Sequence, residues 1–216
     1  MTEIQRKAVY ALFVKQNHEL DGLMDYSDFL SFLRNASAEE IWSVISANRT
    51  ELTAITTKNI PQFSEKRDMY KALKIIIAAD TMRLEYKDLG YYLCKVDRKP
   101  EAKRKYAENQ YMLAVQIGLA YEQKPLAVTE FGKAFSSLQQ EGDKDEVLKR
   151  LCLSIPVMQQ ILLLAETQNV NVVEFLSSYL APTTVLRRRS NIHTFLDWLR
   201  TISTGEMDLI LNRIVW

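Results

Sequence analysis

An internal repeat constrains the fold of this chain more than any other feature of its sequence. The matched segments are Lys74–Ala79 with Ile161–Glu166 and, at the same spacing, Leu89–Leu93 with Leu176–Leu180. A basic cluster follows each copy, Lys103–Arg104–Lys105 in the first and Arg187–Arg188–Arg189 in the second. Each cluster opens a further amphipathic run. The order in both copies is therefore an apolar helix, a short second helix, a basic turn and a third helix.

The composition is that of a globular protein. The chain has 216 residues, of which 47% are hydrophobic and 25% are charged, enough for two small domains or one larger domain. The formal net charge is only +1, so any binding to a nucleic acid must rest on local basic patches. The start of the chain lacks the pattern of a signal peptide, and the apolar runs are too short to cross a bilayer. We expect a cytoplasmic protein that makes no membrane contact.

The cysteines and histidines favour no metal site. Cys94 and Cys152 both lie in apolar helical patterns, which predicts buried free thiols in a cytosolic protein. The two histidines are His18 and His193, and no Cys-x-x-Cys motif accompanies them. A zinc site is therefore not expected, and neither is a cofactor.

Scarce glycine and proline, 6 and 5 residues, together with helical spacing of apolar residues, predict a mainly α fold. Residues 1–63 form an N-terminal helical segment. Its expected helices are Ile4–Gln16, Tyr26–Leu33 and one that the capping box Ser37–Glu40 opens and that runs through Ile45. The polar stretch Thr50–Phe63 ends in a predicted linker. This segment has no partner in the repeat, and its sequence assigns it no role.

The first repeat, residues 64–140, contains a predicted β-hairpin after its three helices. The helices are expected over Met69–Thr81, Glu85–Cys94 and Glu101–Ile117, with a turn at Asp97–Pro100. Two short β-prone runs within Leu119–Thr129 then flank a charged tip with a proline, as in a hairpin. Thr129 is the expected cap of an exit helix.

This order resembles a winged helix-turn-helix domain over about residues 64–138. The residues that carry the resemblance are Ile117–Gly118–Leu119 and Leu126–Lys133. In such domains the third helix enters the major groove and the hairpin, or wing, touches the DNA backbone or minor groove. The resemblance implies a mainly α protein in which the N-terminal segment precedes two tandem winged-helix-like modules with a small β-hairpin.

The second repeat, residues 147–216, follows a charged stretch, Glu141–Glu146, that predicts a connector. Its expected features are Pro156 before helix one, an Asn171 cap on helix two, a turn at Pro182–Thr184 and helix three over Leu186–Ser203. The sequence leaves open whether this copy has a wing, because Met207–Val215 fits a helix as well as a strand. The stretch Thr184–Trp198 is similar to DNA-recognition segments of type II restriction endonucleases.

Duplex DNA requires cations for phosphates and hydrogen-bonding side chains for base edges. Both repeats offer such residues in and after the basic turn. The candidates in the first repeat are Lys95, Arg98, Lys99, Lys103, Arg104, Tyr106, Gln110 and, at the hairpin tip, Lys124. The candidates in the second are Arg187, Arg188, Ser190, Asn191 and Thr194. The alternative for each cluster is a solvated helix face whose charge serves solubility.

No catalytic residues are expected. Restriction-type nucleases need an acidic residue and an Asp/Glu-x-Lys triplet on adjacent strands to hold a metal ion. Glu85–Lys87 and Glu101–Lys103 have that spelling but fall in predicted helices. Neither a glycine-rich phosphate loop nor a Gly-x-Ser-x-Gly motif occurs in the sequence.

These observations predict sequence-selective binding of double-stranded DNA without catalysis, as the recognition component of a restriction or other defence system. Further partners would be a nuclease or other protein subunit, or a second copy of the chain. One alternative is a transcriptional regulator that binds an operator. Another is a winged-helix protein-interaction scaffold, with the N-terminal helices as its docking surface.

Overall fold

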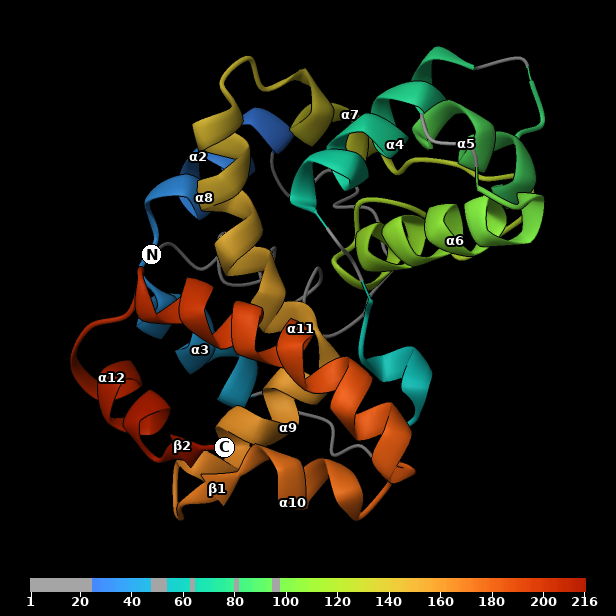
Figure 1. The fold of residues 1–216 in the computed structure, drawn as a ribbon. Helices are drawn as coiled ribbons and strands as arrows, with labels where there is room; N and C mark the ends of the chain where they lie inside the picture. Colours follow the sequence, from blue (N-terminus) through green and yellow to red (C-terminus); the bar gives the residue numbers. More distant parts are fainter. Residues whose placement is uncertain (1–24, 48–53, 63–64, 80–81, 95–97) are drawn as a thin grey trace.

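The computed structural model describes residues 25–47, 54–62, 65–79, 82–94 and 98–216. The predicted mainly α fold is confirmed, since helices account for most of these residues and the strands are minimal (Figure 1). Within the described residues, no single helix has the length and apolarity for a membrane crossing. Among the same residues, one pair of helices has that length and apolarity when taken together, but it is bent by 71°. The pair consists of Glu141–Ser154 and Pro156–Ala165.

The elements follow the repeat in the sequence. The N-terminal segment contains α2 (Tyr26–Asn35), α3 (Ala38–Ala47) and the 3-10 turn η1 (Thr57–Asn59). The first module contains α4 (Lys66–Ala78), α5 (Tyr86–Leu93), α6 (Pro100–Gln116) and α7 (Glu130–Ser137). The remaining elements are α8 (Glu141–Leu151), η2 (Cys152–Ser154), α9 (Pro156–Ala165), β1 (Val170–Asn171), α10 (Val172–Ser177), α11 (Pro182–Arg200), α12 (Gly205–Asn212) and β2 (Ile214–Val215).

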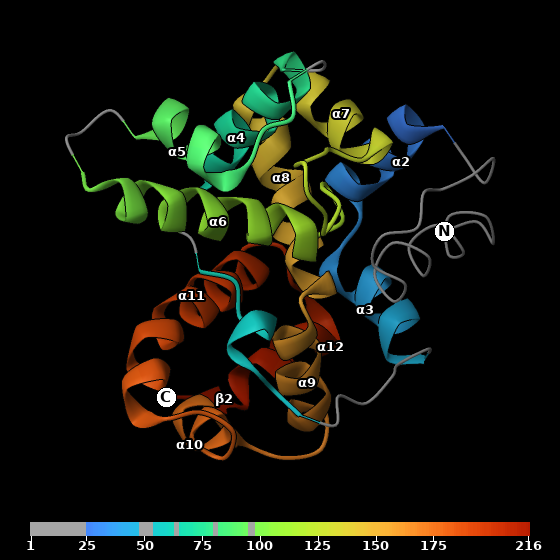
Figure 2. The same cartoon turned by 90° about the vertical axis from the view of Figure 1, so that its right-hand side faces the viewer.

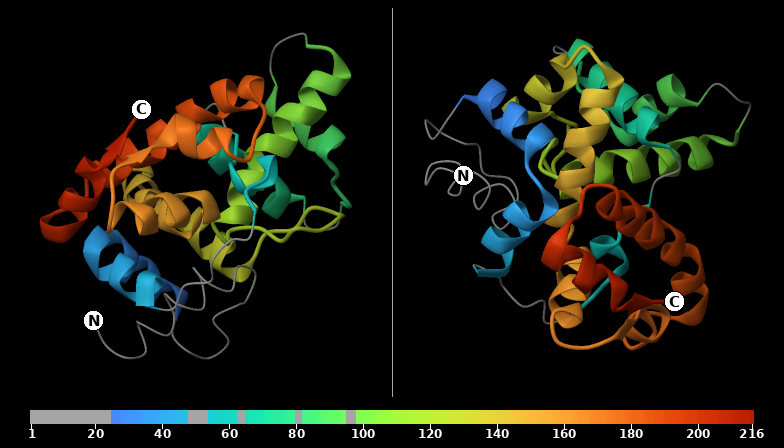
Figure 3. Two further views of the ribbon diagram at one scale, coloured as in Figure 1. Left: turned by 90° about the horizontal axis from the view of Figure 1, so that it is seen from below. Right: turned by 90° about the vertical axis from the view of Figure 1, so that its left-hand side faces the viewer.

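The N-terminal segment is packed across both modules. Its α2 contacts α7 and α8, whereas α3 contacts α12 of the second module (Figure 3). The predicted capping box is confirmed, because the Ser37 amide donates to Glu40 at 2.9 Å and the Glu40 amide donates to the Ser37 hydroxyl at 3.2 Å. The expected helix Ile4–Gln16 lies outside the described residues.

The stretch predicted as a linker is largely packed against the core. Ile55, Ile60 and Pro61 are all buried, although polar residues surround them in the sequence. The Lys58 carbonyl accepts the Gln116 side chain of α6, and the Ile60 carbonyl accepts the Arg188 guanidinium of α11, so the stretch from 54 to 62 forms a wedge between the two modules. The linker was predicted at the end of the polar stretch Thr50–Phe63, and that prediction is therefore wrong for Ile60 and Pro61.

A minimal hairpin follows α6, as predicted. Ala120 and Val128 form an antiparallel bridge, and the Tyr121 amide donates to the Ala127 carbonyl at 3.1 Å. The Leu126 amide donates at 2.9 Å to the carbonyl of Leu84, which precedes α5. The two arms of the hairpin are thus bonded to each other and to the stretch that precedes α5.

The residues around Thr129 fix α7 on this hairpin. The Thr129 hydroxyl accepts the Gly132 amide at 2.9 Å, which caps α7 as expected, and donates to the Gly118 carbonyl at 2.9 Å. A Cβ on Gly132 would lie only 2.0 Å from the Leu119 carbonyl oxygen. The helix therefore approaches the preceding backbone so closely that only glycine fits at this position.

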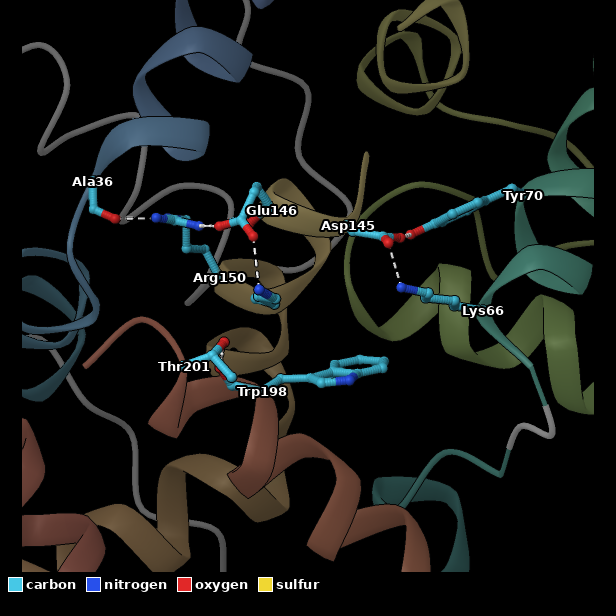
Figure 4. A network of polar contacts seen from close by, with 9 residues as sticks. Ala36, Lys66, Tyr70, Asp145, Glu146, Arg150, Trp198 and Thr201 are labelled. Carbon is cyan, nitrogen blue, oxygen red and sulfur yellow. Dashed lines mark hydrogen bonds and ion pairs between the residues drawn. The ribbon is translucent and has the colours of Figure 1, made fainter. Parts of the chain in front are cut away.

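The charged stretch Glu141–Glu146 is not a connector but the first half of α8. Acidic residues are favourable in the first turns of a helix, and here they also bind other elements. The Asp145 carboxylate pairs with Lys66 and accepts the Tyr70 hydroxyl at 2.8 Å (Figure 4). Glu146 pairs with Arg150 at 2.8 Å, and Arg150 donates to the Ala36 carbonyl at 2.6 Å (Figure 4).

The second module closes without a hairpin. The chain leaves α12 into β2, which pairs in parallel with β1 through Val170–Ile214 and Asn171–Val215. The turn predicted at Pro182–Thr184 is instead the first turn of α11. Proline suits the first position of a helix because that residue has no amide hydrogen to satisfy, and Pro100 occupies the same position in α6.

Of the three apolar pairs that the repeat predicts at equivalent core positions, one is equally buried in both modules. Leu89 and Leu176 are both fully buried, as the repeat predicts. In the first helix Ile76 is buried but its match Leu163 is only half-buried, whereas Leu162 is fully buried. The core-facing side of α9 is therefore displaced relative to the match drawn from the sequence. Leu93 and its match Leu180 differ in the same way.

Candidate nucleic-acid interface

The starts of α6 and α11 are the candidate interface. Each begins at the proline that follows the turn of its repeat, and both starts lie on the same side of the molecule, at the left in Figure 2. Figure 3 shows the same relationship from the opposite side. A single extended ligand could therefore reach both helix starts.

In the first module, α6 lies directly on α5. A Cβ on Gly90 would stand 2.6 Å from the Lys103 carbonyl oxygen, so the two helices cross there at backbone distance. The rings of Tyr86 and Tyr111 meet edge to face, 5.8 Å apart, at the other end of α5. This packing fixes the direction in which the start of α6 projects.

Three cations of the first module lie over tyrosine rings, and none of them pairs with a carboxylate of the described residues. The cation-to-centroid distances are 5.4 Å for Arg98 over Tyr106, 5.2 Å for Lys103 over Tyr91 and 5.5 Å for Lys124 over Tyr86. A ring face attracts a cation without neutralising its charge. These cations are oriented while their charge stays available to an anionic partner.

The basic turn contains two further candidate residues, Lys99 and Lys95. Lys99 is exposed and immediately precedes α6, in the N-cap position. Lys95 lies outside the described residues.

Arg104 is neutralised on the surface of α6. Its guanidinium pairs with Glu101 at 2.6 Å and with Glu108 at 3.3 Å, and Lys105 also pairs with Glu108, at 3.1 Å. The hydrogen bond to Glu101 raises the pKa of Arg104. A phosphate contact by Arg104 would have to displace these carboxylates, so its predicted role is not supported by the geometry.

Tyr106 and Gln110 were predicted on the groove-facing side, and that placement is wrong. The Tyr106 hydroxyl donates to Asp68 on α4, and burial together with this bond raises its pKa. Gln110 is 0% exposed. The reason is that the second half of α6 is packed on several sides, so a polar residue opposite the apolar stripe also enters the core.

In the second module, the residues available to a ligand lie on the exposed side of α11. Arg187, Arg189 and Ser190 are exposed, and Thr194 is partly exposed. Among the residues that the structure describes, no carboxylate pairs with Arg187 or Arg189. More than two helical turns further along, Asp197 is occupied by His193 at 2.7 Å and Arg200 at 3.0 Å.

Asn191 is buried and Arg188 is half-buried, which corrects their predicted roles. The Arg188 guanidinium donates to the Ile60 carbonyl at 2.9 Å, and burial lowers its pKa. Asn191 is only 7% exposed. The wedge from 54 to 62 covers the side of α11 that carries Arg188, and the repeat does not include this wedge.

Two exposed tyrosines went unnoticed in the sequence. Tyr92 and Tyr179 occupy matched positions of the repeat and are 52% and 47% exposed. Tyr92 lies in the last turn of α5, and Tyr179 follows the end of α10. Lys71 donates to the Tyr92 carbonyl at 3.1 Å and adds a cation beside the first. The alignment of the two copies contained this information, since it pairs the two tyrosines directly.

The described residues contain no group of three or more His, Cys, Asp or Glu side chains arranged to hold a metal ion. Cys94 and Cys152 are free thiols. Cys152 is buried as predicted, and burial raises the pKa of its thiol, whereas Cys94 is only half-buried. Neither arrangement points to redox or nucleophilic chemistry.

Comparisons with protein-family models, with curated proteins and with solved structures found no match.

Proposed function

We propose that this protein binds double-stranded DNA through the starts of α6 and α11, with Arg98, Lys99 and Lys103 in the first module and Arg187, Arg189 and Ser190 in the second. One observation carries the proposal. The two copies of the repeat direct equivalent helix starts to one side of the molecule (Figure 2), and no described carboxylate pairs with the five cations named above.

The division of roles follows from the chemistry of the residues. Lysines and arginines beside a turn are suited to phosphates, which supply affinity and register. Arg187 and Ser190 lie on the exposed side of a helix, from which arginine can pair with guanine and serine with several base edges. The net charge of +1 makes affinity depend on these few contacts.

The hairpin is the part of the first module that would act as a wing. Its tip residue Lys124 is exposed and lies over Tyr86. The setting we propose is the recognition part of a restriction or other defence assembly, in which another subunit would supply the chemistry. Binding to an operator would use the same interface.

A salt series on matched variants tests the proposal. Fluorescence anisotropy with a labelled duplex of random sequence, between about 50 and 200 mM salt, gives the slope of log K against log salt. We expect the slope to fall by about 0.9 for each phosphate contact that Lys99→Ala or Lys103→Ala removes. Arg104→Ala is the matched control, because its charge is already paired, and it should leave the slope unchanged.

The proposal fails if the parent protein does not bind duplex DNA at the lower salt concentration. It also fails if Arg104→Ala lowers the slope as much as its neighbour Lys103→Ala does. Selection of sequences from a randomised duplex pool then tests selectivity, and no enrichment would reduce the proposal to non-specific binding.

A further inference from the structure

A cavity of about 310 Å³ lies between the two modules, beside the wedge from 54 to 62. Its walls come from the wedge, α5, α6, the hairpin and α11. The residues that matter for its chemistry are Lys58, Tyr86, Asn109, Met112, Gln116 and Arg188. Since the cations of the proposed DNA interface do not line it, this cavity is a separate site.

Gln116, one of the residues that line the cavity, carries an unsatisfied acceptor. Its side chain is 7% exposed, and its Nε2 donates to the Lys58 carbonyl. Its Oε1 is buried without any donor. A buried polar atom without a partner is unfavourable, so a ligand that brings an N–H group to this oxygen gains a hydrogen bond the protein does not supply.

Arg188 provides a partly buried positive charge. One of its nitrogens is used by the Ile60 carbonyl at 2.9 Å, and no described carboxylate pairs with the guanidinium. The exposed ammonium group of Lys58 belongs to the same wall. An arginine fork of this kind binds phosphate or carboxylate groups well.

The acidic residues of the wall leave this charge in place. Glu108 is already shared between Arg104 and Lys105, at 3.3 Å and 3.1 Å. Glu122 is exposed on the hairpin. An anionic group is therefore favoured beside Arg188 and Lys58, away from these two carboxylates.

Tyr86 and Met112 add a polarisable, mostly apolar part to the wall. The Tyr86 hydroxyl lies 3.9 Å from the Met112 sulfur. Aromatic rings and thioethers both pack well against flat unsaturated rings. The amide of Asn109 adds a donor and an acceptor nearby.

We propose that this cavity binds a nucleoside monophosphate, with the phosphate at Arg188 and Lys58 and a base N–H group at Gln116 Oε1. A nucleoside monophosphate has the three features that the residues of the wall can bind, namely an anion, a flat ring and an N–H donor. The inference does not depend on DNA binding.

Isothermal titration calorimetry of the full chain tests it with the four ribonucleoside 5′-monophosphates, the corresponding nucleosides and inorganic phosphate. We expect at least one monophosphate to bind tenfold or more tightly than its nucleoside and than phosphate. Equal affinity for phosphate would mean a simple anion site and overturn the proposal. Equal affinity for the nucleoside, or no binding by any monophosphate, would overturn it too.

Two variants locate the site. Lys58→Ala changes an exposed side chain and keeps the backbone carbonyl that Gln116 uses, so it should weaken monophosphate binding at least tenfold with an unchanged melting temperature. Lys105→Ala is the control, because this lysine lines the same cavity but is paired with Glu108. Unchanged binding in Lys58→Ala and in Arg188→Gln, or equal loss in Lys105→Ala, would place the ligand elsewhere and overturn the assignment.

Discussion

The hydroxyl group of Tyr111 accepts a hydrogen bond from the Ala127 amide at 3.1 Å and lies 3.1 Å from the Ala127 carbonyl. The same hydroxyl lies 2.5 Å from the Tyr121 carbonyl on the other arm of the hairpin. Tyr111 itself is fully buried in the middle of α6. A single side chain of the third helix therefore holds both arms of the hairpin against the module.

Tyr111→Phe should lower the free energy of unfolding by about 1–3 kcal/mol, because it removes the partner of the Ala127 amide and the bonds that join the hairpin to α6. Urea unfolding followed by circular dichroism measures the change. The matched control is Tyr92→Phe, which removes a hydroxyl from an exposed ring and should change the stability by less than about 0.5 kcal/mol. Equal values for both variants would show that the hairpin does not depend on Tyr111.

The same tyrosine predicts a loss of stability at high pH. Burial raises the pKa of Tyr111 to about 12, whereas an unfolded tyrosine titrates near 10. The protonated form is thus favoured in the folded state. Its contribution is fully present below pH 10 and is lost as the pH rises toward 12, with a slope of up to about 1.4 kcal/mol per pH unit.

Unfolding by urea at pH 9, 10 and 11 measures this slope, and Tyr111→Phe should show a shallower one than the parent. Burial and the bond to Asp145 also raise the pKa of Tyr70, so Tyr70→Phe should flatten the curve as well. A parent protein whose stability is flat up to pH 11 would contradict the assigned burial of both rings.

We predict that replacing Gln110 by an apolar residue stabilises the fold. Its side chain is fully buried, and neither its Nε2 nor its Oε1 has a hydrogen-bond partner. Gln110→Met keeps a similar shape and removes both unsatisfied groups, so it should raise the free energy of unfolding by about 1–3 kcal/mol. Gln123→Met, on the exposed hairpin, is the control and should be neutral. A destabilised Gln110→Met variant would indicate that the amide has partners in solution.

Local features of this fold could be predicted from the sequence because neighbouring residues determine them. The Ser37–Glu40 box, the Thr129 cap and the hairpin are all set by contacts between residues close in the chain. The inner and outer sides of the third helices are not set in this way. Gln110 and Asn191 are buried by elements that no spacing within their own helices shows.

Arg188 illustrates the same limit at the candidate site. In the sequence it is one of three equivalent arginines, and only the wedge from 54 to 62 distinguishes it, by supplying the Ile60 carbonyl as its partner. Arg104 differs from Lys103 for a simpler reason. Glu101 and Glu108 lie three residues before and four after it, a spacing that the sequence does show and that predicts ion pairs on a helix.

Because the core-facing side of α9 is displaced from the match drawn from the sequence, two adjacent leucines should contribute differently to stability. Leu162 is fully buried, whereas Leu163, the residue matched to Ile76 by the repeat, is half-buried. Leu162→Ala should cost about 2–5 kcal/mol of stability, as buried leucine truncations do, and Leu163→Ala should cost clearly less. Phe195→Ala, at the fully buried centre of α11, should cost about 3–5 kcal/mol. Thermal melts in which Leu163→Ala is the more harmful leucine variant would support the register drawn from the repeat.

Substitutions of Arg187 and Asn191, which lie one helical turn apart on α11, should affect DNA recognition and stability separately. Arg187 is exposed, so Arg187→Ala should leave the melting temperature unchanged and relax selectivity at particular base pairs, by about 1–3 kcal/mol. Asn191 is buried, so Asn191→Ala should lower the stability by about 1–3 kcal/mol and leave the sequence preference of the folded protein intact. Competition against a randomised duplex pool, together with thermal melts of both variants, measures the two effects independently. An unchanged preference in Arg187→Ala, or an altered one in Asn191→Ala, would show that the exposed side of α11 does not read the bases.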